Sequence, residues 1–151
     1  MINSLIIFGA KYLYLIVLAI AAIYFLKLPR SQQKNLAIFG LISLAVIFIV
    51  SRIAGYFYYD PRPFVAGHFN PMIAHTADNG FPSDHALLTS AVAAIIYFYN
   101  KKISIALFIL SLLVGLSRVL TGIHHWIDIL GAIFLSIICT SIIHFFFQRR
   151  G

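Results

Sequence analysis

Three short polar clusters interrupt a strongly apolar chain, and their residue types suit phosphate chemistry. Arginine presents a planar fork of N–H donors that matches two phosphate oxygens at once. Arg62 and Arg118 are therefore candidate phosphate ligands. The clusters are Asp60-Pro-Arg-Pro-Phe64, Phe81-Pro-Ser-Asp-His85, and the segment from Ser117 and Arg118 through His124 to Asp128.

Two histidines and an acid in these clusters suit phosphoryl transfer. His124 and Asp128 stand four residues apart, so they share one helix face if that helix begins by residues 122–123. The carboxylate can then hold one ring nitrogen of His124 and leave the other free to attack phosphorus. His85 can donate a proton to the leaving group. We interpret His125 as a bystander or supporting residue, because on a helix it points about 100° away from its neighbour.

A helix is expected to begin at Ser83 and Asp84, directly after Pro82. The free amide groups and the positive dipole end of a helix start form an anion site. Ser83 can cap this helix and can also donate its hydroxyl to a phosphate oxygen. Asp84 repels a phosphate unless it pairs with an arginine or with His75, and the sequence leaves both pairings open.

The elements that must position these clusters are long apolar runs. The chain is 62% hydrophobic and 10% charged, whereas soluble domains are about 25% charged. Apolar runs of roughly 18 or more residues predict membrane-spanning helices. The sequence therefore predicts one domain, residues 1–151, folded as an all-α integral membrane bundle of about five to six transmembrane helices. The predicted spans are residues 5–26, 36–59, 84–99, 103–120 and 127–147.

The charges predict the orientation of this bundle. With five spans, seven of the eleven positive residues fall on one side, which the positive-inside rule assigns to the cytoplasm. The polar clusters and the N-terminus then fall on the extracytoplasmic side, and the C-terminus is cytoplasmic. The net charge of +7 does not indicate nucleic-acid binding, because the positive residues do not form one soluble face. The seven residues are Lys27, Arg30, Lys34, Lys101, Lys102, Arg149 and Arg150.

At these residues the chain resembles the type-2 phosphatidic acid phosphatase superfamily of membrane enzymes. The family pattern has a lysine, six residues and Arg-Pro, then Pro-Ser-Gly-His, and then Ser-Arg, five residues, His, three residues and Asp. The third motif is matched in full, the second at three positions and the first at its Arg-Pro. The matching residues are Arg62, Pro63, Pro82, Ser83, His85, Ser117, Arg118, His124 and Asp128.

The chain departs from the family pattern at two positions. Gly55 stands where the family has its lysine, and we expect Arg52, one turn earlier, to reach the same phosphate. Asp84 stands where the family has glycine. The Pro-Ser-Asp-His form, with Ala-Asp-Asn at 77–79 before it, is similar to the bacitracin-resistance branch of undecaprenyl-diphosphate phosphatases.

The resemblance implies hydrolysis of undecaprenyl diphosphate to undecaprenyl phosphate and phosphate, which recycles the cell-wall lipid carrier. His124 would be the nucleophile and form a phosphohistidine, with His85 as acid and then base and Asp128 stabilising His124. The resemblance implies no metal and no cofactor, and a lipid phosphate as the partner at the membrane. The implied phosphate-binding residues are Arg62, Ser83, Arg118, Arg52 and Asp84.

Two other functions stay open on the sequence. The first is a glycerolipid phosphatase acting on phosphatidylglycerophosphate or phosphatidic acid, because the motifs read the phosphate and not the tail. The second is a metal-binding or transport membrane protein, since histidines and a carboxylate suit zinc. Neighbouring Arg62 and Arg118 argue against the second, because they would repel a cation. The metal ligands would be His85, His124, His125 and Asp128.

Overall fold

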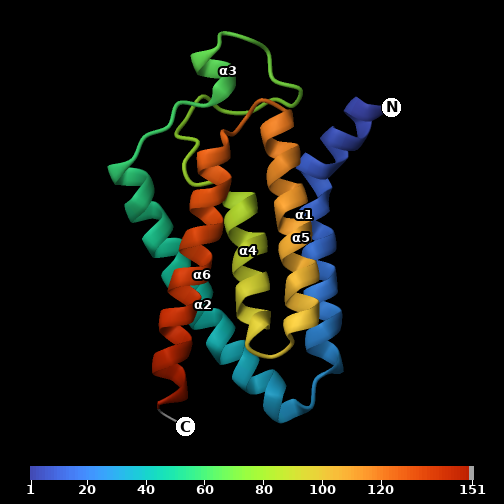
Figure 1. Ribbon diagram of the computed structural model, residues 1–151, viewed down its shortest axis with the longest axis vertical. Helices are drawn as coiled ribbons and strands as arrows, with labels where there is room; N and C mark the ends of the chain where they lie inside the picture. The colour runs from blue at the N-terminus through green and yellow to red at the C-terminus, as the bar shows by residue number, and fades with distance from the viewer. Residues whose placement is uncertain (150–151) are drawn as a thin grey trace.

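The computed structural model describes residues 1–149, which form an all-helical bundle (Figure 1). Four of the helices are long and apolar enough to cross a membrane, namely α1, α2, α5 and α6. The predicted integral membrane bundle is thereby confirmed. The helices are α1 (Ile2–Lys27), α2 (Arg30–Phe57), α3 (Pro63–Ala66), α4 (Asp84–Tyr97), α5 (Lys101–Leu120) and α6 (Trp126–Gln148).

The sides of the long helices expose large apolar side chains. Leu15 of α1, Phe48 of α2, Ile109 of α5 and Phe134 of α6 are each between 47% and 64% exposed. Such a surface suits contact with lipid tails rather than with water.

The helix α4 differs from the other long helices in its length and surroundings. It has 14 residues, most of them buried, and it packs mainly against α5 and α6. At 1.5 Å per residue it extends about 21 Å, which is less than the hydrocarbon thickness of about 30 Å. The predicted span 84–99 therefore begins at the expected residue but forms a short helix enclosed by its neighbours (Figure 1).

Buried hydroxyl groups hold α4 in place. Ser90 Oγ donates to Ser136 Oγ of α6 at 2.9 Å, and the hydroxyls of Thr89 and Ser111 of α5 lie 2.8 Å apart. Small residues and hydrogen bonds between helices are the usual contacts in membrane bundles, because apolar burial does not distinguish protein from lipid. These bonds fix the height at which α4 begins, and thus the position of the polar residues at its N-terminus.

The polar segment 58–83 covers one end of the bundle and contains the short helix α3, with Pro63 in its first turn. The ends of α2 and α5, the starts of α4 and α6, and the N-terminus all lie at this end (Figure 1). The α1–α2 turn, the α4–α5 turn and the end of α6 lie at the other end (Figure 1). The three polar clusters therefore meet at one end, away from the positive residues of the turns; Arg150 lies outside the described residues.

Candidate active site

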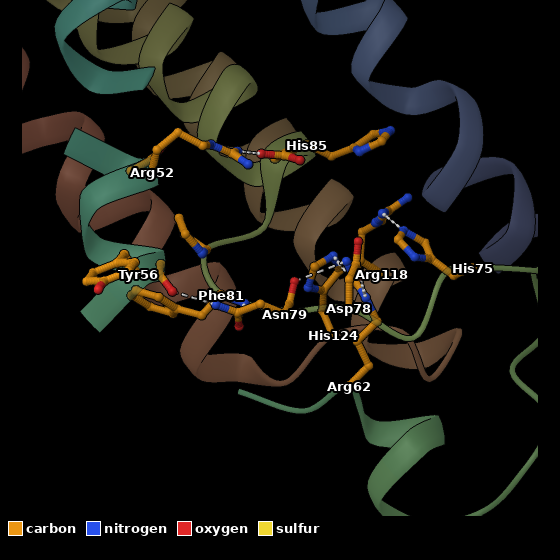
Figure 2. A pocket seen from close by; sticks show the side chains of 14 residues that line it. Arg52, Tyr56, Arg62, His75, Asp78, Asn79, Phe81, His85, Arg118 and His124 are labelled. Atoms are coloured by element: carbon orange, nitrogen blue, oxygen red, sulfur yellow. Dashed lines mark hydrogen bonds and ion pairs between the residues drawn. The ribbon is translucent and has the colours of Figure 1, made fainter. Parts of the chain in front are cut away.

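A polar cavity of about 430 Å³ opens at the end of the bundle that the segment 58–83 covers. Its lining comes from α2, α4, α5 and the segments that join the helices (Figure 2). Six of the predicted site residues line this cavity together, although they come from segments far apart in the sequence. They are Arg52, Arg62, Asp84, His85, Arg118 and His124.

The hydrogen bonds of His124 define the protonation of its ring. Nδ1 lies 3.0 Å from Asp128 Oδ2, and Nε2 lies 3.2 Å from Arg62 Nη1. A guanidinium group only donates, so Nε2 is the acceptor and carries the lone pair. Nδ1 then carries the hydrogen and donates it to the carboxylate. If His124 acts as a nucleophile, the nitrogen that attacks is therefore Nε2, which lies beside Arg62.

The helix α6 begins at Trp126 with His125 as its N-cap, so the condition that it begin by residues 122–123 is not met. The predicted contact between His124 and Asp128 nevertheless forms. Asp128 is the third helical residue, and its Oδ2 also accepts from the backbone N–H of His125 at 2.9 Å. A carboxylate at this position bonds back to the amides that open a helix. Asp128 therefore both caps α6 and orients His124.

Arg62 is held rigidly by the segment that covers the site. Its Nε donates to Asp78 Oδ1 at 2.7 Å, and Nη1 donates to the carbonyl oxygen of Ile123 at 2.9 Å. Nη2 lies 3.4 Å from the carbonyl oxygen of Asn79. The residue is only 5% exposed. Its guanidinium is thus fixed beside the nucleophilic nitrogen of His124.

Arg118 is as buried as Arg62, but one of its N–H donors has no partner among the described residues. Nη1 donates to the carbonyl oxygen of Ala10 at 3.3 Å, and Nη2 donates to His75 Nε2 at 3.3 Å. Within residues 1–149, its Nε has no hydrogen-bond partner. Buried polar groups are normally hydrogen-bonded. An unsatisfied guanidinium N–H beside a polar cavity suits an anionic ligand.

The start of α4 also faces this site. Ser83 is the N-cap, as predicted, but its side chain does not cap the helix. Its hydroxyl is fully buried and has no partner among the described residues, while Pro82 and Asp84 line the cavity on either side. His85 lines the cavity and packs edge-on against Tyr14, with ring centroids 4.8 Å apart. The helix start therefore brings His85 into the cavity that His124 lines, whereas Ser83 lies buried and is not among the lining residues.

The structure decides which partner Asp84 takes. Its carboxylate forms an ion pair with Arg52 from α2 (Figure 2), whereas His75 contacts Arg118 instead. The repulsion that an unpaired acid would exert on a phosphate is thereby reduced. Arg52 lines the cavity, as predicted, although it stands on the α2 side, apart from the group of Arg62 and His124 (Figure 2).

The absence of a lysine at position 55 has a steric cause. A Cβ atom on Gly55 would lie 2.9 Å from the carbonyl oxygen of Phe81. Asn79 holds the segment there, because its Nδ2 donates to the carbonyl oxygens of Gly55 at 2.8 Å and Tyr58 at 3.0 Å. A side chain at position 55 requires the covering segment to move.

Sequence reasoning missed several residues that support the site. Asp60 Oδ2 lies 2.7 Å from His125 Nδ1, so His125 is a supporting residue rather than a bystander. Asp78 and Asn79 hold Arg62 and the covering segment, as described above. The only signal for them was their position inside or beside the motifs, in Asp-Pro-Arg-Pro and Ala-Asp-Asn.

Burial shifts the acidity of several groups in the loops of the site. The pKa of His124 is lowered, mainly by burial, although its hydrogen bond to Asp128 acts in the opposite direction. Burial, followed by the charge of Arg62, also lowers the pKa of His75. Burial alone would raise the pKa of Asp78, but hydrogen bonds from Arg62 and Thr76 lower it below its ordinary value. The rings of His124 and His75 are thus favoured in their neutral form among fixed cations.

One group of side chains has the composition of a metal site. Asp60, His125 and Asp128 each offer a ligand atom, and these atoms lie within 4.8 Å of one another. This group differs from the predicted metal set, which included His85 and His124. Asp128 Oδ2 already contacts His124 Nδ1 and accepts from the backbone N–H of His125, and Asp60 Oδ2 contacts His125 Nδ1. These contacts use Asp128 Oδ2 and Asp60 Oδ2 as support for His124, whereas Asp128 Oδ1 is buried without a partner among the described residues.

Comparisons with known proteins give the family of this chain. The family model of the PAP2 superfamily matches residues 41–151. Undecaprenyl-diphosphatase BcrC of Bacillus subtilis is 33% identical over 140 residues, which cover 91% of this chain and 70% of that protein. Bacitracin transport permease protein BcrC of Bacillus licheniformis is 27% identical over 91% of this chain and 68% of its own length.

A solved structure has the same fold. It is the first transmembrane PAP2 type phosphatidylglycerolphosphate phosphatase from Bacillus subtilis, with a TM-score of 0.70 and 22% sequence identity. The match covers 98% of this chain and 77% of that one. The family match over most of the chain, the relative at 33% identity and the geometry around His124 lead to one conclusion: this chain belongs to the PAP2 superfamily.

Proposed function

We propose that this chain is a membrane lipid phosphatase that hydrolyses undecaprenyl diphosphate to undecaprenyl phosphate and phosphate, with His124 as the nucleophile. The observation that carries this proposal is the state of the His124 ring. Its Nδ1 lies 3.0 Å from Asp128 Oδ2 and its Nε2 accepts from Arg62 at 3.2 Å, inside a cavity lined by two further arginines and two further histidines.

In the first step, His124 Nε2 attacks the terminal phosphorus and the bond from this phosphorus to the bridging oxygen breaks. His85 gives its proton to the leaving lipid phosphate. Asp128 stabilises the positive charge that the attacking ring acquires. The product of this step is a phosphohistidine and undecaprenyl phosphate.

In the second step, water attacks the phosphohistidine and the phosphorus–nitrogen bond breaks. His85 accepts a proton from this water, so that both histidines return to their starting states and phosphate leaves. Fixed cations stabilise the charge on the phosphoryl oxygens, the role that metal ions have in kinases. Arg62 and Arg118 have this role here, and the buried hydroxyl of Ser83 is a further donor.

The choice of lipid rests on the relatives. The relative at 33% identity is an undecaprenyl-diphosphatase, and the match covers 70% of its length. The second relative is named a transport permease, so the activity itself must be measured.

The face of the membrane is part of the proposal. We place the site on the extracytoplasmic side and the C-terminus on the cytoplasmic side. Support comes from the positive residues of the two turns and of the end of α6, which lie at the bundle end opposite the cavity. They include Lys27, Arg30, Lys34, Lys101, Lys102 and Arg149.

Phosphate release by the purified protein in detergent tests the function. The substrates are undecaprenyl diphosphate, phosphatidic acid and phosphatidylglycerophosphate, each with and without excess chelator. We expect the diphosphate to be hydrolysed fastest and the rate to be unchanged by chelator. Faster hydrolysis of either glycerolipid would refute the choice of lipid. Loss of activity in chelator that zinc restores would refute the metal-independent mechanism.

A further inference from the structure

A second cavity adjoins the polar one. It has a volume of about 380 Å³ and lies between α2 and α4. Apart from two residues its lining is apolar, in contrast to the polar cavity around His124. Arg52 and Asp84 line both cavities and are the only lining residues that the two share. The apolar lining consists of Leu44, Ile47, Phe48, Leu87, Leu88 and Ala91.

The ion pair at this junction is exposed and easily exchanged. The side chains of Arg52 and Asp84 are 51% and 69% exposed. Asp84 is the only hydrogen-bond partner of Arg52 within residues 1–149, and the guanidinium lies 5.0 Å from the ring centroid of Phe48. Exposed ion pairs contribute little to stability, because water screens them. A more highly charged anion can therefore replace the carboxylate on Arg52.

The position of Arg52 separates it from the reacting phosphate. Arg62, beside the His124 nucleophile, and Arg118, with its free Nε, provide the cations for the phosphate that is hydrolysed. Arg52 reaches into the polar cavity from α2 (Figure 2), and it also lines the apolar cavity. An extended ligand that places its terminal phosphate at His124 and its tail between α2 and α4 must pass Arg52.

We propose that Arg52 binds the lipid-side phosphate of a lipid diphosphate, and that the apolar cavity between α2 and α4 holds the first part of its hydrocarbon tail. Asp84 occupies Arg52 in the empty site and is displaced by the diphosphate. This inference rests on the proposed function and makes Arg52 the residue that selects a diphosphate over a monophosphate. The apolar cavity is assigned to the tail because it adjoins the phosphate cavity at Arg52 and Asp84.

The test compares two substrates with the same tail, undecaprenyl diphosphate and undecaprenyl phosphate. For Arg52→Gln we expect kcat/KM to fall about 10- to 100-fold on the diphosphate, as for loss of a charged hydrogen bond, and about threefold or less on the monophosphate. Arg52→Lys retains the charge and should lose less. Asp84→Asn leaves Arg52 without its competitor and should raise kcat/KM more on the diphosphate than on the monophosphate, because only the diphosphate has a second phosphate for Arg52. Lys102→Gln, which removes a charge at the other end of the bundle, is the matched control.

Two results would overturn the assignment of Arg52. An equal loss on both substrates would place this residue at the hydrolysed phosphate, and no loss on either would make it a membrane anchor. If the wild-type protein releases phosphate from no lipid, the proposed function fails instead, and the two failures are therefore distinguishable. Thermal unfolding of each variant separates lost folding from lost selectivity.

The tail contact has its own variant. Leu88→Trp enlarges a half-buried side chain that lines only the apolar cavity. We expect it to lower kcat/KM more for undecaprenyl diphosphate than for isopentenyl diphosphate, whose five-carbon tail fills less of the cavity. Equal effects on the two diphosphates would show that the tail does not lie between α2 and α4.

Discussion

The two sides of the phosphate cavity hold their arginines in different ways. On the His124 side, Arg62 is 5% exposed and donates to a carboxylate, to a backbone carbonyl and to the nucleophilic ring. On the α2 side, the side chain of Arg52 is 51% exposed and has one carboxylate partner in the described part of the chain.

This difference separates chemistry from recognition. A cation that is fixed before the reaction stabilises developing charge without reorganising, so burial and several hydrogen bonds suit Arg62 to the reacting phosphate. An exposed ion pair is worth only about 0–1 kcal/mol, so Arg52 can change partners when a substrate arrives. The variants below should therefore have large effects on the buried side and small effects on the exposed side.

The largest effect among the supporting residues is expected for Asp128→Asn. The asparagine loses the negative charge that stabilises His124 when it bonds to phosphorus. A comparable loss costs about 10⁴-fold in a serine protease triad, and we expect a fall in kcat of about 10³- to 10⁴-fold. Single-turnover phosphate release measures it. A rate within threefold of wild type would show that the buried side does not depend on this carboxylate.

The second effect compares the two arginines directly. Arg62→Lys cannot reproduce the fork that joins Asp78, Ile123 and His124, so we expect kcat to fall about 10²-fold, as for loss of one donor to a developing oxyanion. Arg52→Lys should lower kcat/KM on the diphosphate by less than tenfold. Steady-state kinetics of both variants measures the contrast, and equal losses would remove the distinction between the two sides.

A smaller effect is expected for Asp60, which contacts His125, the residue next to the nucleophile. Asp60→Asn weakens the contact to His125, whose backbone amide bonds Asp128. We expect kcat to fall about tenfold, the size of one hydrogen bond, with KM unchanged. A change confined to KM or to thermal stability would mean that Asp60 does not position His124 through this chain of contacts.

The smallest expected effect is a shift in pH dependence. Burial lowers the pKa of His124 below its ordinary value of 6.5, so its ring stays neutral at a pH where an exposed histidine is half protonated. Activity should therefore persist as the pH falls through 6.5, and the acid limb of kcat/KM should have its midpoint below this value. Asp128→Asn removes a contact that raises this pKa and should move the limb to still lower pH. A wild-type midpoint above 6.5 would contradict the burial of His124.

The sequence predicts the buried side of the site better than the exposed side. The ends of four apolar runs and the placement of charge already bring Arg62, His85, Arg118 and His124 to one end of a bundle. Their proposed roles follow from residue type and spacing, and the structure brings them to one cavity.

The remaining features depend on contacts that have no periodic signal. The partners Asp78 and Asn79 lie in an irregular segment, and Gly55 is explained only by the approach of Phe81. Hydropathy predicted the bounds of α4 and α6 to within two residues, as 84–99 and 127–147. It did not predict that α4 lies enclosed by its neighbours, because an apolar run does not show whether it faces lipid or other helices.

The most direct test of the account is to trap the phosphoryl group on His124. Purified protein is mixed with lipid diphosphate radiolabelled in its terminal phosphate, quenched in alkaline denaturant and analysed by peptide mass mapping, beside His124→Ala. We predict one phosphoryl group on His124 of the wild type, and no phosphate release above background by the folded variant. Phosphate release by His124→Ala at a rate close to wild type would contradict the central claim.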